Sequence, residues 1–259
     1  MKVLFIGDIV GKSGRDCVSS LLFTLKVENN IDLTIANGEN SAHGKGITYR
    51  IYKQFMSEGI DYITMGNHSF SKSEIVEHID DMDRLIVPYN HCKRTTNNYY
   101  KIIDIKGIRI CLTNILGDVL IGETSISPFE SMDAILEETK DKKIDFYFVD
   151  FHAETTAEKR IFLEYYKDVC KVIVGTHTHV QTADEQIIHN CAFISDVGMC
   201  GAIDSVIGRD IEESINQKVF GIKSSYTVAE GNPMFSAVVI DIDENTKLPR
   251  SINRIQIRP

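Results

Sequence analysis

Residues 171–179 read Lys-Val-Ile-Val-Gly-Thr-His-Thr-His, and this stretch indicates a buried strand that delivers ligands at its end. Residues 172–174 are β-branched, which suits a strand covered on both faces. Gly175 lets the backbone turn sharply at the carboxyl end of that strand. In open α/β sheets the ligand crevice lies at this end of the strands, so His177 and His179 predict a metal site.

A histidine pair with this spacing also has a simpler interpretation, as two structural or solvated side chains. The rest of the sequence favours ligands, because polar side chains follow several other predicted strands. Strands are predicted at residues 2–7, 32–36, 62–65 and 145–151. The side chains that follow them are Asp8, Glu39, Asn40, Asn67, His68 and His152. The sequence therefore predicts one rim on which carboxylates, amides and imidazoles meet.

Capping signals indicate helices between these strands. Ser13 and Asp16 resemble a capping box that opens a helix ending near Asn29, and Ser71 with Glu74 resembles another. Further helices are predicted at residues 49–57, 127–140, from residue 155 onward, and at 209–217.

Later segments complete a predicted α/β chain. Residues 85–116 resemble a hairpin with its turn at residues 106–107, and more strands are predicted within residues 181–188, 190–198 and 232–243. With no repeat or linker visible, we expect a single domain over residues 1–259.

Composition places further bounds on function. The chain has 43% hydrophobic and 25% charged residues, as an ordinary globular protein does, and no apolar run long enough for a signal peptide or a membrane span. We expect a cytoplasmic protein without membrane contacts. The net charge of −9 disfavours broad nucleic-acid binding but is compatible with a small phosphate substrate and with a homo-oligomer.

The six cysteines are widely spaced and form no C-x-x-C pair, which favours reduced, buried thiols: Cys17, Cys92, Cys111, Cys170, Cys191 and Cys200. The predicted ligands are instead hard oxygen donors mixed with imidazoles. Such a set suits two transition-metal ions, with Fe or Mn favoured and Zn as an alternative. Two ions about 3.5 to 4 Å apart serve in-line displacement at phosphorus, so phosphoester hydrolysis is the predicted reaction.

The strand-end motifs resemble those of the calcineurin-like metallophosphoesterases. In this sequence they stand as Gly-Asp8, Gly-Glu39-Asn40, Gly-Asn67-His68, a lone His152 and Gly-Thr-His177-Thr-His179. The resemblance implies a four-layer α/β/β/α sandwich with the metal site at the carboxyl ends of the strands. Two positions depart from that pattern. Val10 replaces the histidine of Asp-x-His, and Glu39 replaces an aspartate that bridges the metals.

These departures occur together with GDIVGKSGR at 7–15, NGENSAHGKGIT at 37–48, DFHAETTAEK at 150–159, VGTHTHVQTADE at 174–185 and SDVGMCGAIDSVIG at 195–208. Together they make the chain similar to the bacterial YmdB-type phosphodiesterases over nearly its whole length. That resemblance implies hydrolysis of 2′,3′-cyclic nucleotides, and less specifically of other small phosphodiesters. It also implies attack by a hydroxide that bridges two metal ions.

The same resemblance implies a role for each residue of the rim. One metal would take Asp8, Glu39, Asn40 and His179, and the other would take Glu39, Asn67, His152 and His177, with Glu39 bridging and Asn40 substituting for the missing histidine. His68 would protonate the leaving alkoxide, or alternatively serve as a hydrogen-bonding support. Substrate-binding residues stay unassigned, because Lys12, Arg15 and Lys45 could contact phosphate but fit a solvated surface better.

Three functions remain open at this point. The chain is interpreted first as a dimetal phosphodiesterase acting on a small nucleotide. The alternatives are a phosphomonoesterase or protein phosphatase, and a regulatory protein whose metals have little catalytic role.

Overall fold

Two β-sheets packed face to face form the centre of the molecule, which a computed structural model describes for residues 1–93 and 96–258. The first sheet has the order β2 (Asp8–Ile9), β12 (Met199–Ala202), β13 (Pro233–Ile242), β1 (Lys2–Ile6), β3 (Leu33–Asn37), β4 (Tyr62–Thr64) and β5 (Leu85–Ile86), with β14 (Pro249–Ile257) paired to β13. The second has the order β10 (Gln186–Ile188), β11 (Cys191–Ile194), β9 (Cys170–Thr176), β8 (Phe146–His152), β7 (Ile108–Leu116) and β6 (Tyr100–Ile105).

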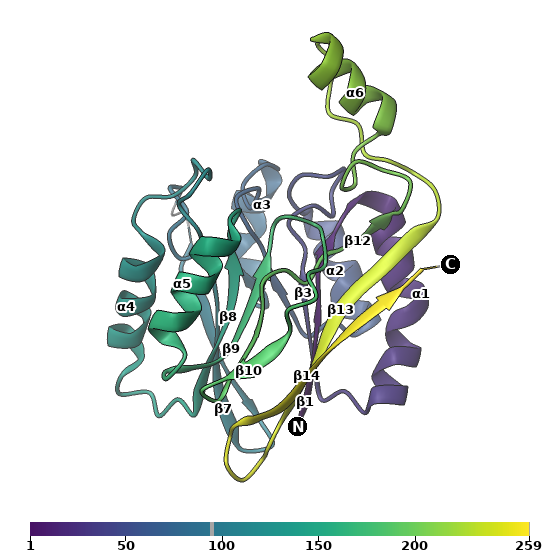
Figure 1. Cartoon of the computed structure of the whole chain (residues 1–259). Coiled ribbons are helices and arrows are strands. Elements are labelled where there is room, and N and C mark those ends of the chain that lie inside the picture. The colour runs from purple at the N-terminus through teal and green to yellow at the C-terminus, as the bar shows by residue number, and fades with distance from the viewer. Residues whose placement is uncertain (94–95, 259) are drawn as a thin grey trace.

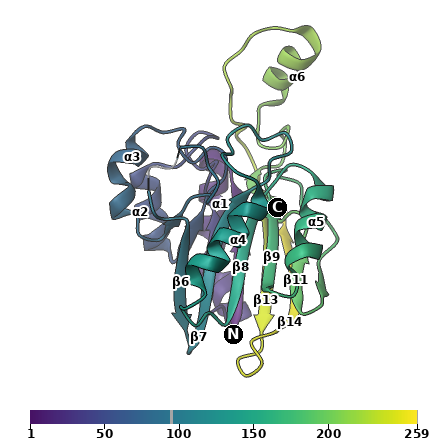
Figure 2. The same ribbon diagram turned by 90° about the vertical axis from the view of Figure 1, so that its left-hand side faces the viewer.

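Helices cover the outer face of each sheet (Figures 1 and 2). The first sheet carries α1 (Gly11–Asn29), α2 (Tyr49–Glu58) and α3 (Glu74–His78), which a 3₁₀ turn (Ile79–Asp81) follows. The second sheet carries α4 (Pro128–Thr139) and α5 (Thr156–Tyr166). This arrangement confirms the predicted four-layer α/β/β/α sandwich.

Alternation along each strand explains why the sequence produces two apolar layers. In β1, Val3 and Phe5 belong to the core between the sheets, whereas Leu4 and Ile6 belong to the cluster beneath the helices. The Phe5 ring stacks on Phe148 of the opposite sheet with a centroid separation of 5.9 Å. Strands buried on both faces need such continuous apolar runs.

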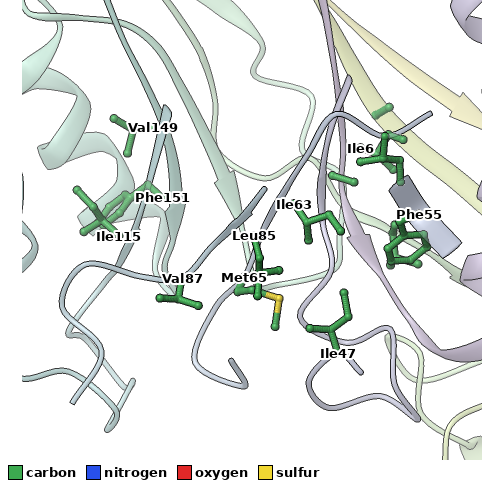
Figure 3. Close-up of a cluster of buried hydrophobic side chains, with 14 of the residues drawn as sticks. Ile6, Ile47, Phe55, Ile63, Met65, Leu85, Val87, Ile115, Val149 and Phe151 are labelled. Carbon is green, nitrogen blue, oxygen red and sulfur yellow. The ribbon is translucent and has the colours of Figure 1, made fainter. Parts of the chain in front are cut away.

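The cluster beneath the helices continues around the edge of the sandwich (Figure 3). Ile6, Phe55 and Ile63 lie on the side of the first sheet, and Val149 and Phe151 lie on the side of the second. The labelled side chains between them are Met65, Leu85 and Val87. The carboxyl ends of strands from both sheets are thereby held at a common edge.

Several predicted boundaries need correction. The capping box predicted at Ser13 is wrong, because α1 already begins at Gly11, whose N–H donates to the carbonyl of Asn40. The box at Ser71 is also wrong, since α3 begins at Glu74, whose carboxylate accepts instead from the N–H of Tyr49.

Other local predictions hold. Ser127 forms the full capping box of α4 with Glu130, and Thr155 caps α5. The β6–β7 hairpin turns at Lys106 and Gly107, both of which have positive φ angles. Strands β12 and β14 were not predicted as such. All six cysteines are free, and all but Cys92 are buried, as expected.

Helix α6 (Ile211–Phe220) stands clear of the sandwich at the tip of a long excursion (Figures 1 and 2). Its aliphatic side chains face solvent, and Val219 is 68% exposed. In the described part of the chain, no helix combines the length and apolar character that a membrane span requires.

Gly175 in β9 lies very close to Ser195, which follows β11, and this contact allows a test of the packing. A Cβ added at Gly175 would lie 1.8 Å from the carbonyl oxygen of Ser195. Because that neighbour is backbone, Gly175→Ala should lower the free energy of unfolding by at least about 1 to 3 kcal/mol. Urea unfolding measures this. Gly122→Ala is the matched control, since nothing lies within 4 Å of its added Cβ. Equal stability of the two variants would contradict the packing described.

Candidate metal centre

All seven predicted metal ligands lie at the common edge where the strands end. Asp8 begins β2 directly after β1, while the others follow or end strands β3, β4, β8 and β9: Glu39, Asn40, Asn67, His152, His177 and His179. The structure brings their donor atoms together in two neighbouring groups. Both sheets contribute, so the site lies where the sheets meet.

The first group surrounds Nε2 of His152, which is fully buried. This nitrogen lies 3.2 Å from Oε1 of Glu39, 3.2 Å from Oδ1 of Asn67 and 3.0 Å from Nδ1 of His177. The ligand atoms of Glu39, His152 and His177 all lie within 4.8 Å of one another. Four donor side chains from four different strand ends therefore converge on one point.

Hydrogen bonding determines which nitrogen of His152 carries a proton. Its Nδ1 lies 2.8 Å from the hydroxyl of Thr176, and that hydroxyl donates its own proton to Asp150 at 2.6 Å. Thr176 can then only accept, so Nδ1 of His152 is the donor. In the neutral ring Nε2 presents a lone pair toward the oxygens of Glu39 and Asn67. Lone pairs that converge in this way are the arrangement that a cation satisfies.

His177 has the opposite tautomer. Its Nε2 lies 3.0 Å from a carboxylate oxygen of Glu154, which can only accept a proton, so Nδ1 is left with the lone pair. That lone pair is directed at Nε2 of His152. Glu154 is thus a positioning residue for His177, as outer partners of metal-bound histidines commonly are.

The second group contains Asp8, Asn40 and His179. Nδ1 of His179 donates to the carbonyl of Ile207 at 2.8 Å, which leaves Nε2 free to face Oδ1 of Asn40 at 3.2 Å and Oδ1 of Asp8 at 3.9 Å. The amide of Asn40 is oriented by its NH₂ group, which donates to the carbonyl of Gly44.

Asp8 supplies the clearest sign that a cation fits. Its Oδ1 is buried and has no hydrogen-bond partner among the described residues, while Oδ2 accepts from the N–H of His177. A buried carboxylate oxygen without a partner is costly. A metal ion between Asp8 and His179 would satisfy it, and the donor set of oxygens and imidazoles suits such an ion.

The electrostatics of the cluster agree with this interpretation. Burial raises the pKa of Asp8 to about 7, although His179 opposes the shift. Burial would lower the pKa of His152, but the charge and hydrogen bond of Glu39 outweigh it and raise that pKa to about 9. Burial and the neighbouring His152 lower the pKa of His177 to about 3. The group thus binds positive charge, and a metal ion competes with the proton for the same place.

His68 lies beside the ligands without joining either group. Its backbone N–H donates to Oε2 of Glu39 at 3.0 Å, and the residue lines a cavity of about 230 Å³ together with His177 and His179. Burial lowers the pKa of its imidazole. This location is compatible with proton transfer to a substrate, and the catalytic role stays a prediction.

Val10 stands at the position of the histidine in the Asp-x-His pattern. It is the N-cap of α1 and is buried beside two glycines. A Cβ at Gly208 would lie 2.8 Å from Cγ1 of Val10, and one at Gly201 would lie 3.2 Å from its Cβ. Asn40 instead places an oxygen next to His179, so its predicted role as the substitute ligand is geometrically feasible.

Several residues at the site were not assigned from the sequence. Asp150 interrupts an apolar strand, which is a signal that could have been used, because a buried carboxylate requires partners. Arg209 and Tyr226 line the same cavity as His68, but no sequence signal connects either of them to the strand ends. Asp196 accepts from the N–H of Thr178 and so fixes the turn between the two histidines.

Comparison with known proteins gives full-length matches. The YmdB-like protein family matches over residues 4–255. A 2′,3′-cyclic-nucleotide 2′-phosphodiesterase of Bacillus subtilis (strain 168) is 41% identical over 258 residues, which cover 99% of this chain and 97% of the relative. The crystal structure of a novel phosphatase from Mycoplasma pneumoniae has a TM-score of 0.93 at 33% identity and covers 100% of this chain and 93% of that one. A hypothetical protein from Thermus thermophilus has a TM-score of 0.90 at 29% identity, with 100% of both chains covered.

The proton arrangement around His152 can be tested at Thr176. Thr176→Val keeps the shape of the side chain but removes the acceptor for Nδ1 of His152, so the lone pair at Nε2 is no longer fixed. We expect metal affinity to fall by about 10- to 100-fold. Competition with a chelator measures it. Thr176→Ser keeps the hydroxyl and should retain most of the affinity. If the valine variant binds metal as tightly as the wild type, Thr176 does not set the tautomer.

Proposed function

Because this chain belongs to the YmdB-like protein family, we propose that it is a metal-dependent phosphodiesterase that hydrolyses 2′,3′-cyclic nucleotides. The observation that carries the proposal is the convergence of ligand atoms around Nε2 of His152, together with the unpartnered Oδ1 of Asp8 beside them. A full-length relative is named for this reaction.

Two metal ions fit the two groups of donors. Glu39, Asn67, His152 and His177 would hold one ion, and Asp8, Asn40 and His179 would hold the other with Glu39 shared between them. Iron is the first candidate, with manganese and zinc as alternatives. When bound, such ions make water nucleophilic at neutral pH and offset charge on phosphate oxygens.

The reaction adds water across one ester bond. A P–O bond to the water oxygen forms, the bond between phosphorus and the ribose 2′ oxygen breaks, and that oxygen leaves with a proton to give a nucleoside 3′-phosphate. His68 supplies the proton from the rim of the cavity. The bound phosphodiester anion favours the protonated form of the His68 ring, which burial otherwise disfavours.

A phosphomonoesterase is the second candidate, because the solved relative from Mycoplasma pneumoniae is described as a phosphatase. A panel of one cyclic diester, one open diester and one monoester separates the two enzymes. Inactivity on all three in metal-loaded protein would favour the regulatory alternative instead.

The shared carboxylate predicts the metal content. Wild-type protein should hold about two transition-metal ions per chain, and Glu39→Ala should lose both because the proposal makes its carboxylate a ligand of each ion. Elemental analysis after reconstitution with iron, manganese or zinc measures this. Glu164→Ala, on the exposed surface of α5, should keep both ions. Full metal content in Glu39→Ala, or full wild-type activity with a single ion, would contradict the two-metal proposal.

The role of His68 depends on the leaving group. A ribose alkoxide has a high pKa and needs a proton, whereas a nitrophenolate does not. His68→Ala should therefore slow hydrolysis of a 2′,3′-cyclic nucleotide by roughly 10²- to 10⁴-fold while sparing most activity toward bis-p-nitrophenyl phosphate. His78→Ala, at a histidine that stacks on Tyr49, is the control. Equal losses on both substrates would mean that His68 positions phosphate and is not the acid.

A further inference from the structure

Residues 203–232, between β12 and β13, form an arm that extends from the sandwich and carries α6 (Figures 1 and 2). Near its start, the carbonyl of Ile207 accepts from Nδ1 of His179. The two stems of the arm are joined by backbone hydrogen bonds, from Asp210 N–H to the carbonyl of Thr227 and from Ala229 N–H to that of Gly208. This pairing sets Arg209 on one stem and Tyr226 on the other at the wall of the ligand cavity.

Tyr226 lies at the boundary between two cavities. It lines the cavity of about 230 Å³ that contains the ligands, and it lines a neighbouring cavity of about 380 Å³ together with Gly11, Lys12 and Arg15. Its ring contacts the loop that carries Asn40, because a Cβ at Gly44 would lie 2.5 Å from Cε1 of Tyr226. The ring therefore borders both the cavity of the candidate metal centre and the larger neighbouring cavity.

Two cationic side chains lie near this ring. Cζ of Arg209 is 4.9 Å and Nζ of Lys45 is 5.2 Å from its centroid. Arg209 is held in place by Glu213 and Gln217, yet its buried Nε has no hydrogen-bond partner among the described residues. Lys45 is exposed and has no such anchors in the hydrogen bonds described, so it can move away from the ring.

We propose that Tyr226 and Arg209 form the nucleobase subsite of this enzyme. The base of a nucleotide stacks on the Tyr226 ring at the mouth of the larger cavity and displaces Lys45, while its phosphate lies at the ligands. Such stacking tolerates every base, because each presents a flat π face. The inference rests on the proposed function and names the part of the substrate that lies away from phosphorus.

A pair of substrates that differ only in the base tests the subsite. They are 2′,3′-cyclic AMP and methyl riboside 2,3-cyclic phosphate, which has the same diester and no base. In metal-loaded protein, Tyr226→Leu should raise the KM for cyclic AMP by roughly 10- to 100-fold and leave the KM for the riboside unchanged. Tyr226→Phe should keep the wild-type KM for both, since it keeps the ring.

A matched control and a binding measurement exclude a merely structural effect. Tyr49 also has a lysine near its ring, Lys53, but lies on α2 away from the cavity, so Tyr49→Leu should change neither KM. Calorimetric titration with 3′-AMP and ribose 3-phosphate should show that Tyr226→Leu weakens only the former.

The outcomes separate this inference from the proposed function. If wild-type protein hydrolyses neither cyclic substrate, the proposed function is wrong, and the titration with 3′-AMP still decides the subsite. If Tyr226→Leu affects both substrates equally, or affects neither, Tyr226 only anchors the arm and the subsite is overturned.

Discussion

The direction of one proton determines the geometry of the candidate metal centre. Because the hydroxyl of Thr176 gives its proton to Asp150, it must accept the Nδ1 proton of His152. In the neutral ring, Nε2 of His152 must then direct its lone pair toward Glu39 and Asn67. Asp150 is fully buried, and it can serve this purpose because Asn37 and Thr64 of the first sheet also donate to its carboxylate. Residues buried in the sandwich therefore determine the tautomer of His152 at the site.

The packing of the sheets sets the distances across this site. Glu39 comes from the first sheet and His152 from the second, and their separation of 3.2 Å requires that nothing lie between them. Gly66 makes that possible, since a Cβ there would lie 2.2 Å from Oε2 of Glu39 and 2.4 Å from Nε2 of His152. The packing of the two sheets therefore determines how closely the ligands at their common edge approach one another.

The sequence predicts the ligands at this edge because each follows an apolar run that is adjacent to it in the chain. Prediction fails where contacts between residues distant in the sequence determine the structure. His177 and His179 follow a regular apolar run, so their location could be inferred. The capping box at Ser13 failed because the carbonyl of Asn40 satisfies the first N–H of α1 in its place. Tyr226 could not be identified, because stem pairing across residues 203–232 brings it to the cavity, and no local pattern encodes that pairing.

The packing of Val10 bears on whether position 10 could carry a histidine. Its side chain lies against positions 201 and 208, and both are glycines with no room for larger neighbours. A single change of Val10 to histidine would put an imidazole where a valine already fills the space, so it would need compensating changes around those glycines. The proposed centre that uses Asn40 is therefore not converted into one that uses a histidine at position 10 by that substitution alone.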